Sequence, residues 1–311
     1  MNLQVLTGVL TITIQAGAVM LIAAIGELLD ETSGVINLGI EGLMTVGAVG
    51  AIVAVTIVPN PYVALLVGAL VGILFGLLLA VSIVTFNANQ VVSGFALAFF
   101  ATGLGNHIGR AYAGLHQIVH LKTIPIPGLS TIPILGPGLF TQDIMVYVAY
   151  LVLPVIATLL LFRTRLGITI RACGHNPAAA DAAGISVRNV RYFCVIAASA
   201  AAGLSGAYLV LAFAPTWSEG LVSGRGFIAV CLVMFSQWRP SRLVLGTILF
   251  GLATSLGFVA QIQGWSRYSN LFAMVPYVLT VALLILPRLL AKRSRRSKSP
   301  MPAALGQPFI K

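Results

Sequence analysis

Charge is what this sequence has least of, and that scarcity excludes an ordinary soluble fold. Only 8% of the 311 residues are charged, and 59% are hydrophobic. A soluble domain carries about 25% charged residues. No lysine or arginine precedes Arg110, and the basic residues then gather at the ends of apolar stretches and near the C-terminus. The net charge of +11 therefore indicates bilayer orientation rather than nucleic-acid binding, and we predict a polytopic membrane protein.

The sequence also lacks the motifs of several enzyme classes. It has no GxxxxGK[ST] phosphate loop, no HExxH and no GxSxG with a plausible triad, so the chain does not hydrolyse ATP by the usual loop. Its three cysteines, Cys173, Cys194 and Cys231, have no CxxC spacing and predict neither a disulfide framework nor a zinc site. His116 and His120 have no third ligand nearby, so no metal site is expected. We expect a protein that is not an enzyme and holds no cofactor of its own.

Long apolar stretches predict an all-α, polytopic bundle of transmembrane helices. About nine spans are expected, within a range of eight to ten, and the seventh is short enough to belong to a broken or re-entrant segment. They run over residues 5–27, 38–58, 62–85, 90–106, 143–162, 192–213, 226–238, 242–262 and 270–288. Residues 1–290 would then form one transmembrane domain, and the basic tail 291–311 is expected to be disordered in the cytoplasm.

Residues 163–191 stand out because they carry five arginines between two apolar stretches. One central arginine costs about 2.5–3.5 kcal/mol on membrane-insertion scales, so this segment is expected in water, on the cytoplasmic side. Asn176 suits the cap of a helix, Pro177 its first position and Gly184 its end. The helix itself is expected over Ala178, Ala179, Ala180, Asp181, Ala182 and Ala183. A short helix presented there is a contact site for a partner that supplies energy, or else a simple surface connector.

Basic residues also orient the predicted spans. The turn at residues 237–242 and the tail after residue 288 are rich in arginine and lysine, so both are placed inside together with 163–191. Counting backwards puts the N-terminus outside and the proline-containing 107–142 loop outside, with the C-terminus in the cytoplasm. The first four spans have no basic residue, and their orientation depends on this count alone.

Three polar clusters, at residues 27–42, 87–94 and 217–226, interrupt the apolar stretches. The first and third are rich in glycine, contain a glutamate and lead into an apolar helix. We expect them at opposite faces of the membrane, as the broken helices of an inverted repeat around a transport path. The residues expected to line that path or its gates are Asn37, Glu41, Asn89, Gln90, Ser93, Glu219 and Arg225.

Alternatives remain for individual residues of these clusters. Asn37 and Glu41 are four residues apart, which predicts that both face one side of a helix. Glu41 and Arg225 have a structural alternative, in which they pair with backbone groups or with each other to fix helix ends. Glycines at four-residue spacing from Gly68 to Gly76, together with those at 203 and 206, predict close packing between helices.

Four segments carry a resemblance to a known family. They are SGVINLGIEGLMTVGA from Ser33, FNANQVVSGFAL from Phe86, GHNPAAADAAGISVRNVRY from Gly174 and SEGLVSGRGFIAV from Ser218. The sequence resembles the permease subunits of bacterial ABC importers in the branched-chain amino acid and simple-sugar superfamily. Within it, the sequence is most similar to the shorter permease of nucleoside importers. The resemblance implies that residues 174–187 contain the coupling helix that docks in a cleft of the ATPase subunit.

The resemblance also implies the partners and the location of the chain. We expect an ATP-binding subunit that holds ATP and magnesium, a second permease subunit, an external substrate-binding lipoprotein and the lipid of the bacterial inner membrane. Nucleosides are the expected substrates and simple sugars the alternative. A stand-alone secondary transporter or channel would need ion-coupling residues, which the sequence scarcely offers. A membrane enzyme would need a polar catalytic cluster, and residues 27–41 are the only candidate.

Overall fold

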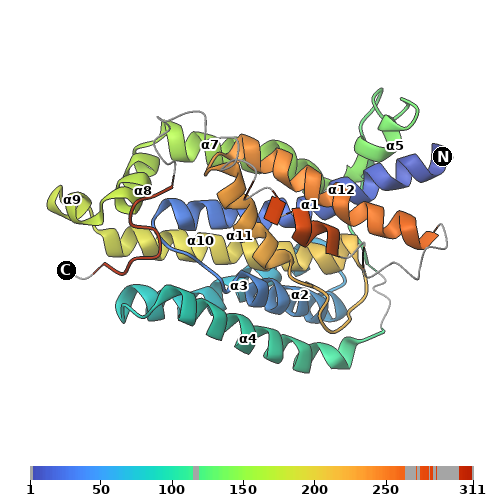
Figure 1. The fold of residues 1–311 in the computed structure, drawn as a ribbon. Helices are drawn as coiled ribbons and strands as arrows, with labels where there is room; N and C mark the ends of the chain where they lie inside the picture. Colours follow the sequence, from blue (N-terminus) through green and yellow to red (C-terminus); the bar gives the residue numbers. More distant parts are fainter. Residues whose placement is uncertain are drawn as a thin grey trace.

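Helices make up most of the described chain, because a backbone surrounded by apolar side chains in lipid must satisfy its own hydrogen bonds. The computed structural model describes residues 3–114, 119–262, 271, 274–279, 281–282, 285 and 301–309. Within them the helices lie side by side in an elongated bundle (Figure 1). The predicted all-α bundle is confirmed. Of the two histidines discussed above, His116 lies outside the described residues.

Seven helical stretches of the described chain are long and apolar enough to cross a membrane. They are Val5–Thr32, Ile40–Ile57, Pro61–Thr85, Gln90–Tyr112, Ile144–Arg163, Val187–Phe213 and Pro240–Ala260. The seventh span, which the sequence predicted to be short, is the helix Arg225–Ser236. Its twelve residues do not reach across a bilayer. The expected ninth span, 270–288, lies partly outside the described residues.

The longer helices are α1 (Leu3–Thr32), α2 (Ile40–Ile57), α3 (Pro61–Ala80), α4 (Gln90–Gly109), α7 (Leu153–Arg163), α8 (Arg165–His175), α10 (Val187–Tyr208), α11 (Arg225–Ser236) and α12 (Pro240–Ile262). The short elements are α5 (Leu135–Leu139), α6 (Ile144–Tyr147), α9 (Pro177–Ala182), a 3-10 turn at Arg110–Tyr112 and the strands β1 (Thr123–Pro125) and β2 (Thr141–Asp143). Three π-helical turns, Val81–Thr85, Val148–Val152 and Leu209–Phe213, continue the spans of α3, α7 and α10.

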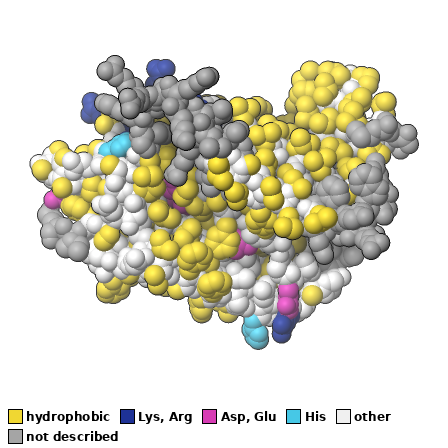
Figure 2. Space-filling view, in the orientation of Figure 1, with side chains coloured by type: hydrophobic (Ala, Val, Ile, Leu, Met, Phe, Trp, Pro, Cys, Tyr) yellow, Lys and Arg dark blue, Asp and Glu magenta, His cyan; other side chains and the backbone are white. Residues whose placement is uncertain are grey.

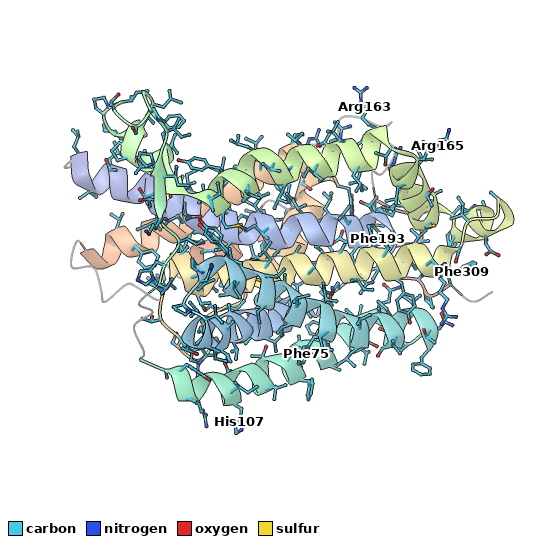
Figure 3. The ribbon with its side chains drawn as sticks, turned by 180° about the vertical axis from the view of Figure 1, so that it is seen from behind. Phe75, His107, Arg163, Arg165, Phe193 and Phe309 are labelled. Carbon is cyan, nitrogen blue, oxygen red and sulfur yellow. The ribbon has the colours of Figure 1, made fainter. Side chains whose placement is uncertain are left out.

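The bundle has two distinct ends, which lie at opposite extremes of Figure 1. One, here called the α9 end, carries α8, α9 and residues 301–309; the other, the α5 end, carries the N-terminus, α5 and the β1–β2 pair. The turn after α1 and the turn before α4 lie at the α9 end, as the predicted alternation of spans requires. Figure 3 shows Arg163 and Arg165 at that end and His107 toward the other.

Helices α1 and α10 form the centre of the bundle. Helix α1 packs against α10, α11 and α12, while α10 also packs against α2 and α3. The contacts of α10 depend on glycine: a Cβ at Gly206 would lie 1.8 Å from the carbonyl oxygen of Met44, and one at Gly72 would lie 2.3 Å from that of Ser199. The close packing predicted from the glycine spacing is therefore confirmed.

The segment between α4 and α7 is more structured than a plain external loop. Strands β1 and β2 pair antiparallel, with Thr123 opposite Asp143. One carboxylate oxygen of Asp143 accepts from the backbone N–H groups of Met145 and Val146 and so caps α6, while the other accepts from the Tyr208 hydroxyl at 2.9 Å. These bonds fix the α5 end to the central helix α10. Burial raises the pKa of the Asp143 carboxyl.

The C-terminal segment 301–309 is ordered, so the prediction of a disordered tail is wrong for these residues. Gly306 N donates to Gly34 O at 3.0 Å, and Ala304 N donates to Gly174 O at 2.9 Å. The composition of the tail gave no sign of these backbone partners, which come from elements far away in the sequence. Residues 291–300 lie outside the described part of the chain.

Candidate functional site

Two non-helical segments enter the bundle from opposite ends. Residues 33–39 enter from the α9 end, where Ile36 N donates to Gln90 Oε1 at 2.9 Å. Residues 214–224 enter from the α5 end, where Glu219 forms an ion pair with Arg110. Each segment leads into a helix, α2 in the first case and α11 in the second. The expectation that the first and third polar clusters are broken helices with opposite entry is met in this arrangement.

The two segments meet at Glu41, in the first turn of α2. Its Oε1 accepts from Gly224 N at 2.7 Å and its Oε2 accepts from Gly226 N at 2.8 Å. The start of α11 is therefore capped by a carboxylate from another helix, which the positive end of a helix dipole favours. A Cβ at Gly226 would lie 2.6 Å from Glu41 Cα, so only glycine allows this approach. The sequence offered pairing of Glu41 with Arg225 or with backbone groups as an alternative, but did not identify these two amides as its partners.

Asn37 does not share a helix face with Glu41, contrary to the prediction from their spacing. Helix α2 begins at Ile40 with Gly39 as its N-cap, so Asn37 lies in the preceding turn. Its side chain accepts from Gly39 N at 3.0 Å and donates to Asp30 Oδ2 at 3.3 Å. Asn37 therefore fixes the turn that leads into α2.

Arg225 and Glu219 are held by separate partners. The Arg225 guanidinium donates to the carbonyl oxygens of Leu221 and Val222, at 2.9 and 3.0 Å, and lies 5.6 Å from the Phe213 ring centre. The Glu219 side chain is 52% exposed in its ion pair. In the structure, Glu41 and Arg225 both pair with backbone groups, as the structural alternative supposed. Their role in a path or gate stays a prediction.

The second polar cluster lies beside the first at the α9 end. Asn89 caps α4, since its side chain accepts from Val92 N at 3.1 Å. Gln90 is buried and connects the 33–39 segment to the C-terminal segment, with its Nε2 donating to Gln307 O at 3.4 Å. Ser93, one turn further along α4, is partly exposed. Of the predicted path residues, the structure thus groups Asn37, Asn89, Gln90 and Ser93 here.

Three carboxylates at the end of α1, Glu27, Asp30 and Glu31, are fully buried in the same region. Glu27 Oε1 accepts from Asn37 N at 3.1 Å, and Glu31 Oε2 accepts from Trp238 Nε1 at 2.8 Å. The sequence grouped these carboxylates with Asn37, but gave no signal for Trp238, which is 207 residues away. Together they fix the end of α1 to the turn between α11 and α12.

The short helix predicted within 163–191 is present as α9. Asn176 caps it by accepting from Ala179 N at 3.0 Å, Pro177 is its first residue, and Gly184 has a φ of +83°. The preceding helix α8 was not predicted. It buries one side, including Ile170 and Cys173, and burial raises the pKa of the Cys173 thiol, which suits a packing role. The structure therefore presents α9 on a support formed by α8 and α10.

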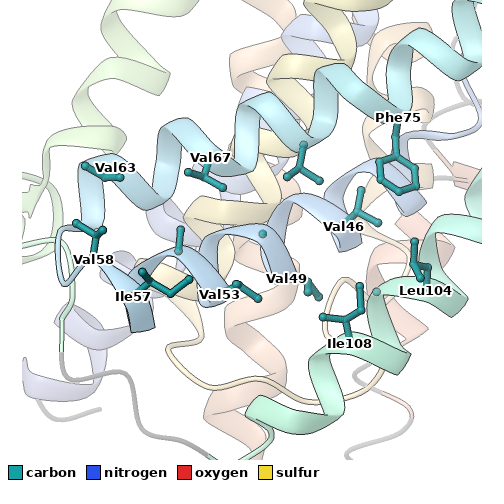
Figure 4. Close-up of a pocket in the computed structure, with 14 residues that line it drawn as sticks. Val46, Val49, Val53, Ile57, Val58, Val63, Val67, Phe75, Leu104 and Ile108 are labelled. Atoms are coloured by element: carbon teal, nitrogen blue, oxygen red, sulfur yellow. The ribbon is translucent and has the colours of Figure 1, made fainter.

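An apolar pocket lies between α2, α3 and α4, with a volume of about 540 Å³ (Figure 4). Its lining consists of valine, isoleucine, leucine, phenylalanine, glycine and alanine side chains, among them Val49, Val67 and Leu104. Such a lining offers no hydrogen bond to a hydroxyl or a base and suits hydrocarbon. Hydrophobic side chains are also spread over the surface seen in Figure 2.

The sequence matches the family described as branched-chain amino acid transport system / permease component over residues 9–284. The chain belongs to this permease family. A protein of Haloferax volcanii, named as a putative glucose ABC transporter permease, is 40% identical in an alignment of 261 positions that covers 82% of this chain and 78% of that one. No solved structure matches the chain. With its apolar spans, the permease is a multi-pass membrane protein, and ABC permeases associate with an ATP-binding subunit and a substrate-binding protein.

Two further relatives are named for nucleosides. A nucleoside ABC transporter permease of Lactococcus lactis is 34% identical in an alignment of 278 positions that covers 86% of this chain and 88% of that protein. A guanosine ABC transporter permease of Bacillus subtilis is 31% identical in an alignment of 321 positions, gaps included, that covers 99% of this chain and 98% of that protein. These relatives are transport subunits, so the expected class of the chain, an ABC permease and no enzyme, is supported.

Proposed function

We propose that this chain is one of two permease subunits of an ATP-driven importer that carries nucleosides across a bacterial inner membrane. The α9 end faces the cytoplasm and the α5 end faces outward. ATP and magnesium bind to the partner ATPase, and an external lipoprotein delivers the substrate. The observation that carries the proposal is the meeting of two re-entrant segments at Glu41, inside a bundle of predominantly apolar helices.

The position of the path follows from the re-entrant segment 214–224. Its backbone is not helical, and residues 218–220 and 223 are exposed at the surface of the chain. Non-helical backbone at membrane depth faces water or protein, since lipid offers it no hydrogen bonds. This surface therefore lines the translocation path and faces the second permease subunit. Glu41, Glu219 and Arg225 shape it from the α5 end, while Asn37, Asn89, Gln90 and Ser93 lie toward the α9 end.

The ATPase acts on the permease through α9. Residues Asn176 to Gly184 form a capped helix that stands out from the bundle and is connected directly to α8 and α10. Because α10 packs along α1, α2 and α3, a displacement of α9 by the ATPase moves the helices beside the path. Such rigid-body movement switches the path between outward-open and inward-open states.

Nucleosides are proposed as the cargo because the relative that aligns over nearly the whole chain is named for guanosine. Simple sugars are the second candidate, favoured by the 40% identity to the putative glucose permease. Both cargoes are uncharged and rich in hydroxyl groups, so both suit a path lined by amide and hydroxyl side chains.

The experiment is uptake by the purified transporter in liposomes. The tagged chain is pulled from native membranes in mild detergent, its partners are identified by mass spectrometry, and the complex is reconstituted with ATP inside. We expect an ATPase and a second permease to be recovered and labelled guanosine to enter only with ATP. Entry of glucose but not guanosine would support the sugar importer instead. Recovery of the chain alone, transporting without ATP, would overturn the importer and support a secondary carrier.

A further inference from the structure

The C-terminal segment 301–309 lies across the α9 end of the bundle, although it follows every membrane span in the sequence. Its backbone bonds to the carbonyl oxygen of Gly34, in the turn after α1, and to that of Gly174, near the end of α8. Ala304 is 6% exposed, so the segment is packed against the bundle and does not merely rest on it. One short stretch thus contacts both the turn that leads into α2 and the helix that supports α9.

The carbonyl oxygen of Gln307 accepts two further hydrogen bonds. One comes from Gln90 Nε2 at 3.4 Å and the other from Arg191 Nη1, on α10, at 3.0 Å. Gln90 Oε1 also accepts from Ile36 N, so the Gln90 side chain bridges the C-terminal segment and the re-entrant 33–39 segment. The C-terminal segment is therefore connected to the residues proposed to line the inner part of the path.

Gly306 gives the segment its shape. Its φ is +76°, a conformation that side-chain-bearing residues rarely adopt, and a Cβ there would lie 3.1 Å from Ile36 Cδ1. A β-branched residue at this position would strain the backbone and push the segment away from Ile36. The backbone conformation at Gly306 therefore allows the C-terminal segment to pack closely against Ile36 of the 33–39 segment.

Phe309 forms one wall of a pocket beside α9. It packs against the small cluster of Cys173, Ala180 and Val187, which belongs to α8, α9 and α10. The pocket has a volume of about 490 Å³ and is completed by the turn between α3 and α4, including Thr85. Its lining is half polar, unlike the apolar pocket between α2, α3 and α4.

We infer that residues 301–309 are part of the surface that receives the ATP-binding subunit, and that they connect this surface to the 33–39 segment. The inference rests on the proposed function. The exposed Arg188 lines the pocket, and the exposed Arg163 and Arg165 lie at the same end of the bundle as Phe309 (Figure 3). A segment of the ATP-binding subunit that fits this surface has an apolar side chain, which enters the pocket, and acidic groups around that side chain. The C-terminal segment then transmits the displacement of α9 to the inner part of the path.

The test uses the complete transporter with substitutions in the segment. Phe309→Ala removes the pocket wall, Gly306→Val displaces the segment, and Phe309→Leu restores an apolar side chain. Phe193→Ala is the matched control, because Phe193 is 47% exposed on α10 and does not line the pocket. Two quantities are measured: the ATPase recovered per permease in the membrane, and the ATP hydrolysed per substrate imported.

We expect Phe309→Ala to lower ATPase recovery about tenfold, the loss that follows when an aromatic anchor of an interface is removed at a cost of about 1.4 kcal/mol. Gly306→Val should raise the ATP consumed per substrate, while Phe309→Leu and Phe193→Ala behave as the wild type. Wild-type recovery and wild-type ATP consumption in both Phe309→Ala and Gly306→Val would overturn the inference. Faster import with unchanged recovery would also overturn it, because the segment would then be an inhibitory lid. A wild-type chain that recovers no ATPase overturns the proposed function instead.

Discussion

Replacing Glu41 by alanine should release the start of α11 while leaving the rest of the bundle intact. The carboxylate accepts from Gly224 N and Gly226 N, at 2.7 and 2.8 Å. A hydrogen bond to a charged group contributes about 1.5–3 kcal/mol, so losing both costs about 3–6 kcal/mol locally. Since 1.4 kcal/mol is a factor of about ten, the two amides should exchange with solvent about two to four orders of magnitude faster. The assay is hydrogen exchange by mass spectrometry on peptides covering residues 217–230.

Two matched variants sharpen this experiment. Glu41→Gln keeps one acceptor oxygen but turns an amide N–H group toward the second donor, so its exchange should fall between wild type and alanine. Glu219→Ala removes the other carboxylate associated with the re-entrant segment, but an exposed one, and should leave the amides of Gly224 and Gly226 unchanged. Unchanged exchange at these two amides in Glu41→Ala would refute the reasoning, whatever happens to uptake.

Three further predictions follow from other contacts. Gly206→Ala should cost about 1–3 kcal/mol, because its Cβ meets the carbonyl oxygen of Met44, whereas Gly103→Ala has open space and should not lower the thermal denaturation midpoint in detergent. Asn176→Ala should cost about 1 kcal/mol in α9 and reduce the ATPase recovered in pull-downs, while Asn176→Asp keeps the cap and the recovery. Arg110→Glu should leave the denaturation midpoint unchanged, because its ion pair with Glu219 is exposed and screened; a fall reversed by Arg110→Glu/Glu219→Arg would contradict this.

Features with a local cause could be predicted from the sequence. The cap at Asn176, the proline after it and the glycine at 184 act within one turn, so α9 was found with its ends nearly correct. The glycine spacing likewise predicted close packing, because helix geometry alone places such residues on one side.

Features that depend on distant partners could not be predicted. Glu41 was singled out as a residue of the path or its gates, but its partners at 224 and 226 are more than 180 residues away. The spacing of Asn37 and Glu41 predicted a shared helix face, which is wrong because the helix begins only at Ile40. The tail was expected to be disordered because its composition is basic and rich in proline, whereas its backbone bonds at Gly34 and Gly174 fix residues 301–309.

In the proposed importer, the half-length helix α11 sets the thickness of the barrier that the cargo meets. Its twelve residues extend about 18 Å, against about 30 Å for the hydrocarbon core. The remaining depth is crossed by the 214–224 segment, whose residues 218–220 and 223 are exposed, so that part of the proposed route is hydrated. Only the stretch beside α11 has to be closed against leakage. A shift of one helical turn, about 5.4 Å, equals nearly a third of the length of that stretch. A small stroke is therefore enough to open the seal, and an equally small defect is enough to make it leak.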